Sequence, residues 1–254
     1  LFGPGKKGER PVFGPLSSTN KGSMNLLIVS TSTVHGKGYL EYILEEVQDF
    51  FSGVEEIVFV PYARPSGISH DDYTALAAKA FAQIGIAVRG VHTFDDPAEG
   101  IHRAAGTFIG GGNTFLLLRE LYAKGLVEPL RKRAAEGMPY MGTSAGSNVA
   151  GQTINNTNDM PIVYPPSFEA LGLMPFNVNP HYLDPDPNST HMGETRETRI
   201  NEFHTQSSTP VVGIREGSWL RFRDEQVELK GPLTARIFQA GQDPWEHNPG
   251  PLEL

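Results

Sequence analysis

The chain has 254 residues, 39% of them hydrophobic, and its 21 basic and 29 acidic side chains give a formal net charge of −8. This length and composition support a sizeable core and exclude a chain that is disordered over most of its length. The acidic balance, without a basic tract, argues against a nucleic-acid partner, because that binding depends on Lys and Arg neutralising phosphates. The absence of cysteine excludes disulfides, thiolate zinc sites and a thiol nucleophile.

The N-terminal residues 1–23 are rich in Gly, Pro, Lys and Ser and show no hydrophobic period, which is typical of a tag or flexible extension. Charged residues stand where the apolar core of a secretion signal would lie, and no apolar run reaches the roughly 18 residues of a membrane helix. We therefore expect the natural chain to start at Met24, with a cytoplasmic location and no membrane partner.

From Met24 onward, short apolar runs alternate with helical patterns. The runs predict strands at 26–29, 57–60, 86–91, 107–109 and 139–142, and the helical spacing predicts helices at 39–51, 71–84 (with Asp71 as its cap), from Pro97, at 114–123 and at 127–136. Strands that alternate with helices of this length predict an α/β fold, a mainly parallel sheet with helices on both faces.

The last fifty residues have a different pattern. Short strands joined by tight turns are predicted at 211–214, 219–223, 226–229 and 236–239. We expect them to form antiparallel C-terminal strands at the edge of the main sheet, an arrangement that is common in this fold class. The pattern contains no repeat and no second core, so residues 24–241 are predicted to form a single domain, followed by a C-terminal tail at 242–254.

The strongest chemical motif is the G-x-S-x-G run from Gly142 to Gly146, which follows a predicted strand and precedes a run of small residues. This context is typical of a nucleophile elbow, in which a tight turn lifts the hydroxyl of Ser144 clear of the sheet. Side chains at positions 142 and 146 would collide with neighbouring backbone, which explains the glycines.

A nucleophilic serine needs a base, and the base needs a group that orients it. Among eight histidines, His181 directly follows the strand-like run at 176–179, and catalytic crevices lie beyond the carboxyl ends of parallel strands. Two acids qualify as the third member. Glu216 follows the strand at 211–214, and Asp159 lies in a polar turn soon after the nucleophile. Spacing alone does not choose between them.

The turn Gly110–Asn113 offers backbone N–H groups ahead of a predicted helix. It lacks the third glycine of a dinucleotide-binding motif and the lysine of a P-loop, so it gives little support for nucleotide binding. An oxyanion hole is the better interpretation, with Gly111, Gly112 and Ala145 as the candidate donors.

Taken together, the motifs resemble the peptidase E (α-aspartyl dipeptidase) family of serine peptidases, which also contains cyanophycinases. The resemblance covers residues 25–241. It rests on Gly110-Gly111-Gly112-Asn113-Thr114-Phe115, Ser144-Ala145-Gly146, the run from Thr157 to Val163, Asn179-Pro180-His181, the run from Gly193 to Glu197, and Glu216-Gly217.

The resemblance implies a fold similar to class-I glutamine amidotransferases and a Ser–His–Glu triad at Ser144, His181 and Glu216. It favours Glu216 over Asp159. Asp159 keeps a weaker role as a substrate-binding residue that shapes the site electrostatically. Relatives cleave dipeptides after an N-terminal aspartate through an aspartyl-enzyme intermediate. The resemblance assigns Arg196 to the substrate carboxylate, and no metal or organic cofactor is implied.

Three alternatives stay open from the sequence: a cyanophycinase-like hydrolase of β-aspartyl-arginine polymer, a non-catalytic binding protein on the same scaffold, and an acyl-ester hydrolase. The Pro- and Asp-rich loop at 183–192 links His181 to the segment of Arg196. We therefore hypothesise that this loop covers the site when substrate binds. The sequence makes no prediction about self-association.

Overall fold

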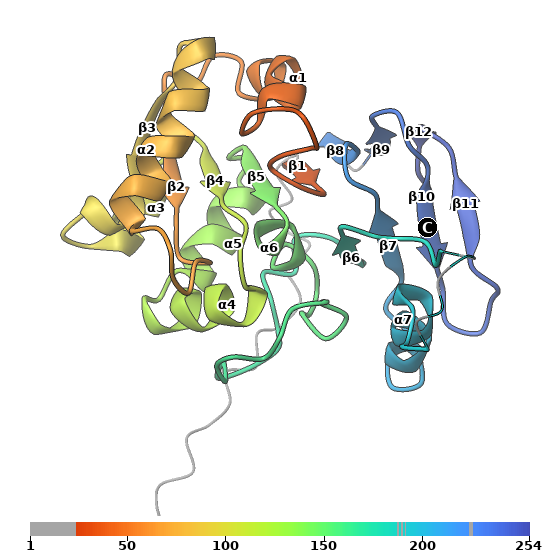
Figure 1. Ribbon diagram of the computed structural model, residues 1–254. Coiled ribbons are helices and arrows are strands. Elements are labelled where there is room, and N and C mark those ends of the chain that lie inside the picture. The colour runs from red at the N-terminus through yellow and green to blue at the C-terminus, as the bar shows by residue number, and fades with distance from the viewer. Residues whose placement is uncertain (1–23, 187, 189, 191, 224–225) are drawn as a thin grey trace, which may run out of the picture.

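A computed structural model describes residues 24–254, except residues 187, 189, 191 and 224–225 (Figure 1). The extension predicted at residues 1–23 lies outside the described residues. None of the described helices is both long and apolar enough to cross a membrane.

A large mixed β-sheet forms the centre of the fold. Its parallel part consists of β1 (Asn25–Val29), β2 (Glu56–Val60), β3 (Ala87–Gly90), β4 (Thr107–Ile109) and β5 (Tyr140–Thr143). Three antiparallel strands extend it beyond β1, namely β8 (Trp219–Arg223), β9 (Gln226–Lys230) and β12 (Gly250–Pro251). The order is β12-β9-β8-β1-β5-β4-β2-β3. The predicted α/β class, with a mainly parallel sheet and antiparallel C-terminal strands, is confirmed.

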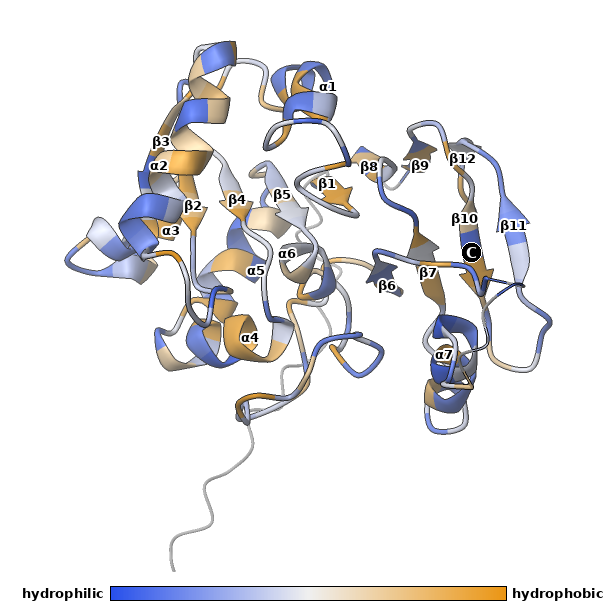
Figure 2. Cartoon of the chain, in the orientation of Figure 1, coloured by the Kyte–Doolittle hydropathy of each residue, from blue (hydrophilic) through white to orange (hydrophobic). Residues whose placement is uncertain are grey.

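Helices cover both faces of this sheet, because alternate side chains of each strand point to opposite sides. Leu27 and Val29 pack with α1 (Leu44–Phe50) and α2 (His70–Phe81) on one face. Leu26 and Ile28 belong to the cluster on the other face, which includes side chains of α3 (Pro97–Arg103), α4 (Thr114–Ala123) and α5 (Val127–Ala135). Figure 2 shows β1, β2 and β4 in the colour of hydrophobic residues, and a mixture of hydrophobic and hydrophilic residues along α2 and α3.

A second, four-stranded sheet was not predicted. It contains β6 (Asn177–Pro180), β7 (Val211–Ile214), β10 (Ala235–Phe238) and β11 (Trp245–His247), in the order β11-β10-β7-β6. The strands expected at 211–214 and 236–239 join this sheet instead of the edge of the main one, because β7 pairs in parallel with β6. Side chains of both sheets, such as Ile28 and Val212, share one core cluster. The shared core supports the prediction that residues 24–241 form a single domain, and that domain assignment stays a prediction.

The structure differs from the sequence prediction at several element ends. The helix expected at 39–51 is a 3₁₀ turn (Glu41–Ile43) followed by α1. The cap of α2 is Ser69 and not Asp71, because Ser69 Oγ accepts a hydrogen bond from the N–H of Asp72 at 3.0 Å. The expected tail at 242–254 contains β11 and β12, which pair with β10 and β9.

Candidate active site

Ser144 lies in a tight turn between β5 and α6 (Ala145–Asn148). Its φ of 52° is in the left-handed region, which a side chain with a Cβ atom rarely adopts outside constrained sites. The flanking glycines make the turn possible. A Cβ atom at Gly142 would lie 2.4 Å from the carbonyl oxygen of Gly146, and one at Gly146 would lie 2.2 Å from that of Ile109. The backbone collisions predicted for these two positions are confirmed.

His181 directly follows β6, and its Nε2 lies 2.9 Å from Ser144 Oγ. The backbone of His181 also has a positive φ, 54°. Its N–H donates to Ser30 Oγ at 2.9 Å, and the Ser30 hydroxyl donates to the carbonyl of Ile214 at 2.8 Å. Ser30 follows β1 at its carboxyl end. It therefore joins the central sheet to β6, which precedes His181, and to β7, which precedes Glu216.

Glu216 completes a chain of polar contacts, because its Oε1 lies 2.6 Å from His181 Nδ1. In the neutral imidazole tautomer with its proton on Nδ1, His181 donates to Glu216, and its free Nε2 accepts from the Ser144 hydroxyl. The structure thus brings together the serine, the histidine and one of the two candidate acids. We call this set the Ser144–His181–Glu216 chain.

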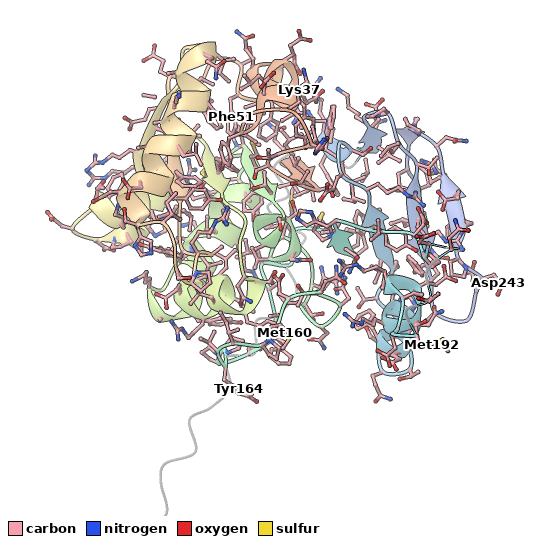
Figure 3. All side chains as sticks on the ribbon, in the orientation of Figure 1. Lys37, Phe51, Met160, Tyr164, Met192 and Asp243 are labelled. Carbon is pink, nitrogen blue, oxygen red and sulfur yellow. The ribbon has the colours of Figure 1, made fainter. Side chains whose placement is uncertain are left out.

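Asp159, the other candidate acid, has a different partner. Its Oδ2 accepts a hydrogen bond from the backbone N–H of Thr114 at 2.7 Å, at the start of α4. Asn113 caps the same helix through the N–H of Leu116. The loop of Asp159 then runs outward, so that Met160 and Tyr164 project into solvent (Figure 3).

Two polar residues near the base were missed from the sequence. Asn158 Nδ2 donates to Asn179 Oδ1 at 3.1 Å and to the carbonyl of Pro180 at 3.4 Å, and thereby holds the peptide that precedes His181. Ser30 is the other. A polar residue just beyond an apolar strand is a signal that could have pointed to Ser30, but the sequence gives no sign of its partners.

The glycine turn after β4 lies against the nucleophile. A Cβ atom at Gly111 would be 3.0 Å from Ser144 Cβ, and one at Gly112, whose φ is 148°, would be 2.2 Å from the carbonyl of Ala63. Within the described residues, the N–H groups of Gly111, Gly112 and Ala145 have no hydrogen-bond acceptor. Free donors beside Ser144 are what an oxyanion hole requires.

Arg196 is the first residue of α7 (Arg196–His204), and it is half-buried. Burial and the neighbouring Arg199 lower the pKa of Arg196, whereas the negative charge of Asp159 raises it. Arg196 makes no ion pair with any described residue, and it stays charged at neutral pH because an arginine pKa is far above 7. Arg196 is therefore a cation without an ion-pair partner among the described residues, and it feels the negative charge of Asp159.

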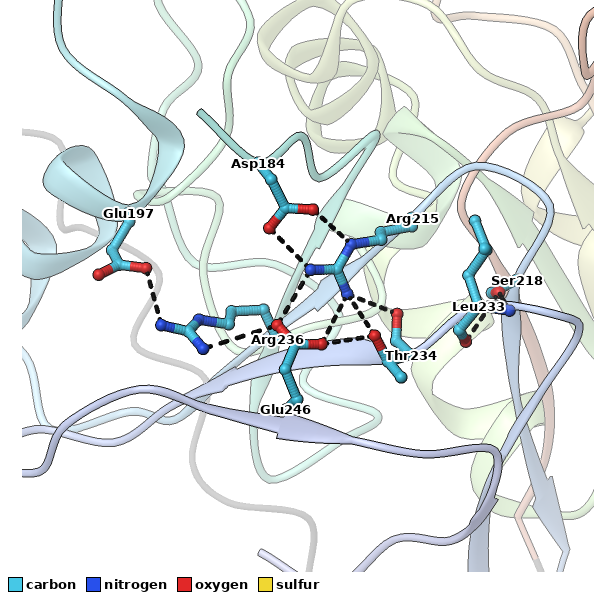
Figure 4. Close-up of polar contacts among 8 residues, drawn as sticks. All are labelled: Asp184, Glu197, Arg215, Ser218, Leu233, Thr234, Arg236 and Glu246. Atoms are coloured by element: carbon cyan, nitrogen blue, oxygen red, sulfur yellow. Dashed lines mark hydrogen bonds and ion pairs between the residues drawn. The ribbon is translucent and has the colours of Figure 1, made fainter. Parts of the chain in front are cut away.

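An ion-pair network surrounds Arg215, which immediately precedes Glu216 (Figure 4). Arg215 binds Asp184, three residues after His181, at 2.7 and 2.8 Å, and it binds Glu246 of β11 at 2.9 and 3.0 Å. Arg236 continues the network from Glu246 to Glu197, the residue after Arg196. The network therefore connects the three chain segments that carry His181, Glu216 and Arg196.

The hypothesis that the loop at 183–192 covers the site falls partly on residues 187, 189 and 191, which lie outside the described residues.

Comparison with known proteins shows the family to which the chain belongs. Residues 26–230 match peptidase family S51. A protein named "Peptidase E" from Streptomyces coelicolor is 53% identical over 88% of this chain and 90% of its own length. A protein of Drosophila melanogaster named "Probable alpha-aspartyl dipeptidase" is 48% identical over 85% of this chain and 90% of its own.

A solved structure supports the fold. The crystal structure of a peptidase from an acI-B1 actinobacterium matches with a TM-score of 0.63, over 90% of this chain and 99% of that one, at 17% identity.

The chain belongs to peptidase family S51, and this membership makes it a hydrolase of the peptidase class. The predicted enzyme class, a serine-type dipeptidase, is the class that the family and the names of the relatives indicate.

Proposed function

We propose that this peptidase is a dipeptidase that hydrolyses the bond after an N-terminal aspartate, with Ser144 as nucleophile, His181 as general base and acid, and Glu216 as the group that orients His181. The observation that carries this proposal is the Ser144–His181–Glu216 chain, with contacts of 2.9 and 2.6 Å. The name of the Drosophila melanogaster relative, "Probable alpha-aspartyl dipeptidase", supports aspartyl dipeptides as the substrate class.

The contacts of His181 lead to a specific reaction sequence. His181 Nε2 takes the proton of the Ser144 hydroxyl as Oγ attacks the carbonyl carbon of the aspartyl residue. The C–N bond then breaks, His181 gives its proton to the leaving amine, and an aspartyl ester on Ser144 forms. Water, deprotonated by His181, attacks this ester and releases aspartate, and the proton returns to Ser144 Oγ.

The negative charge that develops on the carbonyl oxygen needs donors beside Ser144. The N–H groups of Ala145, Gly111 and Gly112 have this role in the proposal. Ala145 follows the nucleophile, Gly111 lies against it and Gly112 is the next residue of the same turn, and none of the three N–H groups has an acceptor among the described residues. Donors that are already in place stabilise the oxyanion without reorganisation, a contribution of about 3–4 kcal/mol for a single group.

Specificity for aspartate requires a cation, and Arg196 supplies it in the proposal. A guanidinium makes a planar, two-pronged contact with a carboxylate, so it binds an aspartyl side chain and discriminates against the uncharged asparagine. The absence of an ion pair at Arg196 within the described chain supports this role, because the charge is available to a substrate.

A panel of dipeptides tests the proposal. The wild-type protein is assayed with Asp-Leu, Asn-Leu, Glu-Leu, Ala-Leu and the β-linked isomer of Asp-Leu. We expect Asp-Leu to be preferred over Asn-Leu by about 100-fold or more in kcat/KM. A preference for the β-linked isomer would instead favour the cyanophycinase-like alternative, and equal rates on all substrates would contradict the proposed specificity.

A further inference from the structure

An N-terminal aspartate presents two charges on the same residue, a β-carboxylate and an α-ammonium group. In the proposed function, on which this inference rests, Arg196 meets the carboxylate. The ammonium group also needs a partner, because a charge that enters a partly buried site without one loses its hydration at a considerable cost. An anion beside Ser144 would satisfy this requirement.

Most carboxylates near the site are already engaged. Glu216 contacts His181, and three others contact arginines: Asp184 with Arg215, Glu197 with Arg236, and Glu194 with Arg199. Asp159 differs from these. Among the described residues, the Asp159 side chain contacts no cation. Its hydrogen bond within this part of the chain is the one that Oδ2 accepts from the N–H of Thr114. Its Oδ1 therefore has free lone pairs.

The position of Asp159 follows from the hydrogen bonds around it. Thr114 comes three residues after Gly111, which lies against Ser144. Asn148, on the helix that follows Ser144, donates to Thr114 Oγ1 at 3.0 Å and to Thr157 Oγ1 at 3.3 Å. The loop of Asp159 is thus fixed both to the glycine turn and to the nucleophile helix.

The charge of Asp159 also acts on Arg196, since it favours the charged form of that guanidinium. No direct ion pair joins the two side chains. The site therefore offers one anion and one cation that do not neutralise each other, which matches the two charges of an N-terminal aspartate.

We propose that Asp159 binds the α-ammonium group of the substrate while Arg196 binds its β-carboxylate. The bond from Thr114 holds the Asp159 carboxylate in place before substrate arrives, so little further ordering is required. An anchored ammonium group also fixes the register of the chain, because it leaves the carbonyl of the first residue at Ser144. The same anchor would exclude substrates with a blocked amino terminus.

Substitution by asparagine tests this role with little disturbance, because Asp159→Asn keeps a side-chain oxygen for the N–H of Thr114 and removes the charge. We would measure binding by calorimetry in the Ser144→Ala protein, which prevents turnover. The two probes are Asp-Leu and N-succinyl-leucine, which is Asp-Leu without its α-amine. Asp96→Asn is the matched control, because Asp96 accepts from the N–H of Ala98 at 2.9 Å at the start of α3.

We expect Asp159→Asn to weaken Asp-Leu binding about tenfold or more, and to leave N-succinyl-leucine within about twofold, because only the first probe carries the ammonium group. Asp96→Asn should change neither. Equal weakening of both probes, or of neither, would overturn the proposal.

A measurement without any change at Asp159 guards against a misfolded variant. In the Ser144→Ala protein alone, Asp-Leu should bind more tightly than N-succinyl-leucine, and equal affinities would overturn an ammonium site. Failure of the proposed function can be told apart from failure of the ammonium site. In the first case the wild-type protein would not hydrolyse Asp-Leu.

Discussion

His181 Nδ1 and Glu216 Oε1 lie 2.6 Å apart although 35 positions separate the two residues in the chain. Strand pairing produces this contact. β6 and β7 are parallel neighbours with Pro180 opposite Ile214, so the residues that follow both strands leave the same edge of the sheet. The backbone N–H of Tyr182 then donates to the carbonyl of Ile214 at 3.0 Å and holds the two exits together.

Replacement of Glu216 by glutamine should lower kcat for Asp-Leu by about 10²–10⁴-fold, because the amide no longer stabilises the imidazolium or fixes the tautomer of His181. KM should stay within about threefold, since Glu216 does not contact substrate in this mechanism. Steady-state kinetics at pH 7 measure both constants. A variant with nearly wild-type kcat would remove Glu216 from the mechanism.

Replacement of Arg196 by alanine should cost about 2–5 kcal/mol of transition-state binding on Asp-Leu, because it removes a charge-assisted contact in a partly desolvated site. The same change should have little effect on Ala-Leu, which has no carboxylate to bind. The comparison of kcat/KM on the two dipeptides checks this, and Arg196→Lys should recover part of the loss. Equal losses on both dipeptides would exclude a role in specificity.

Replacement of Arg215 by methionine should lower the free energy of unfolding at pH 7 by about 1–3 kcal/mol, because Asp184 and Glu246 lose their charge-assisted hydrogen bonds. Urea unfolding measures the change. The matched control is Arg103→Met, which breaks an exposed ion pair with Glu99 and should cost less than about 0.5 kcal/mol. A cost no larger than that of the control would show that the Arg215 network adds no stability.

The effect of Arg215→Met should also depend on pH. Hydrogen bonds from Arg215 lower the pKa of Asp184, although partial loss of hydration acts in the opposite direction. Partial loss of hydration also raises the pKa of Glu246, but bonds from Arg215 and Thr234 outweigh this and lower it. The lowered pKa values stabilise the fold above the ordinary values of 3.8 and 4.5, and this stabilisation is lost as the pH falls below them. The difference between wild type and variant should therefore be smaller at pH 3 than at pH 7.

The sequence was sufficient for much of the fold because local signals and tertiary structure agree. The strand at 107–109 and the helix at 114–123 were predicted with the bounds of β4 and α4, since a buried apolar run and an amphipathic pattern leave little choice of structure. The short strands β11 and β12, of three and two residues, were missed because they are too short to show a period of two.

The candidate site was only partly accessible from the sequence. The glycines around Ser144 are visible because backbone crowding demands them, and His181 is visible because it follows a strand. The choice of β6 as the partner of β7 is a long-range pairing, which no local pattern encodes. Ser30 contacts His181 after β6 and Ile214 of β7, and Asn158 contacts Asn179 and Pro180 of β6. These contacts between distant segments appear only in three dimensions.

Hydrolysis of Asp-Leu by the wild-type protein, Ser144→Ala and His181→Ala, each checked for unchanged circular dichroism and melting temperature, tests the central claim most directly. We predict that the wild type is active and that each variant loses about 10⁴-fold or more in kcat, because nucleophile and base act as a unit. A folded Ser144→Ala protein that keeps more than about one per cent of the wild-type rate would contradict the account, since this chain would then cleave the bond without its serine.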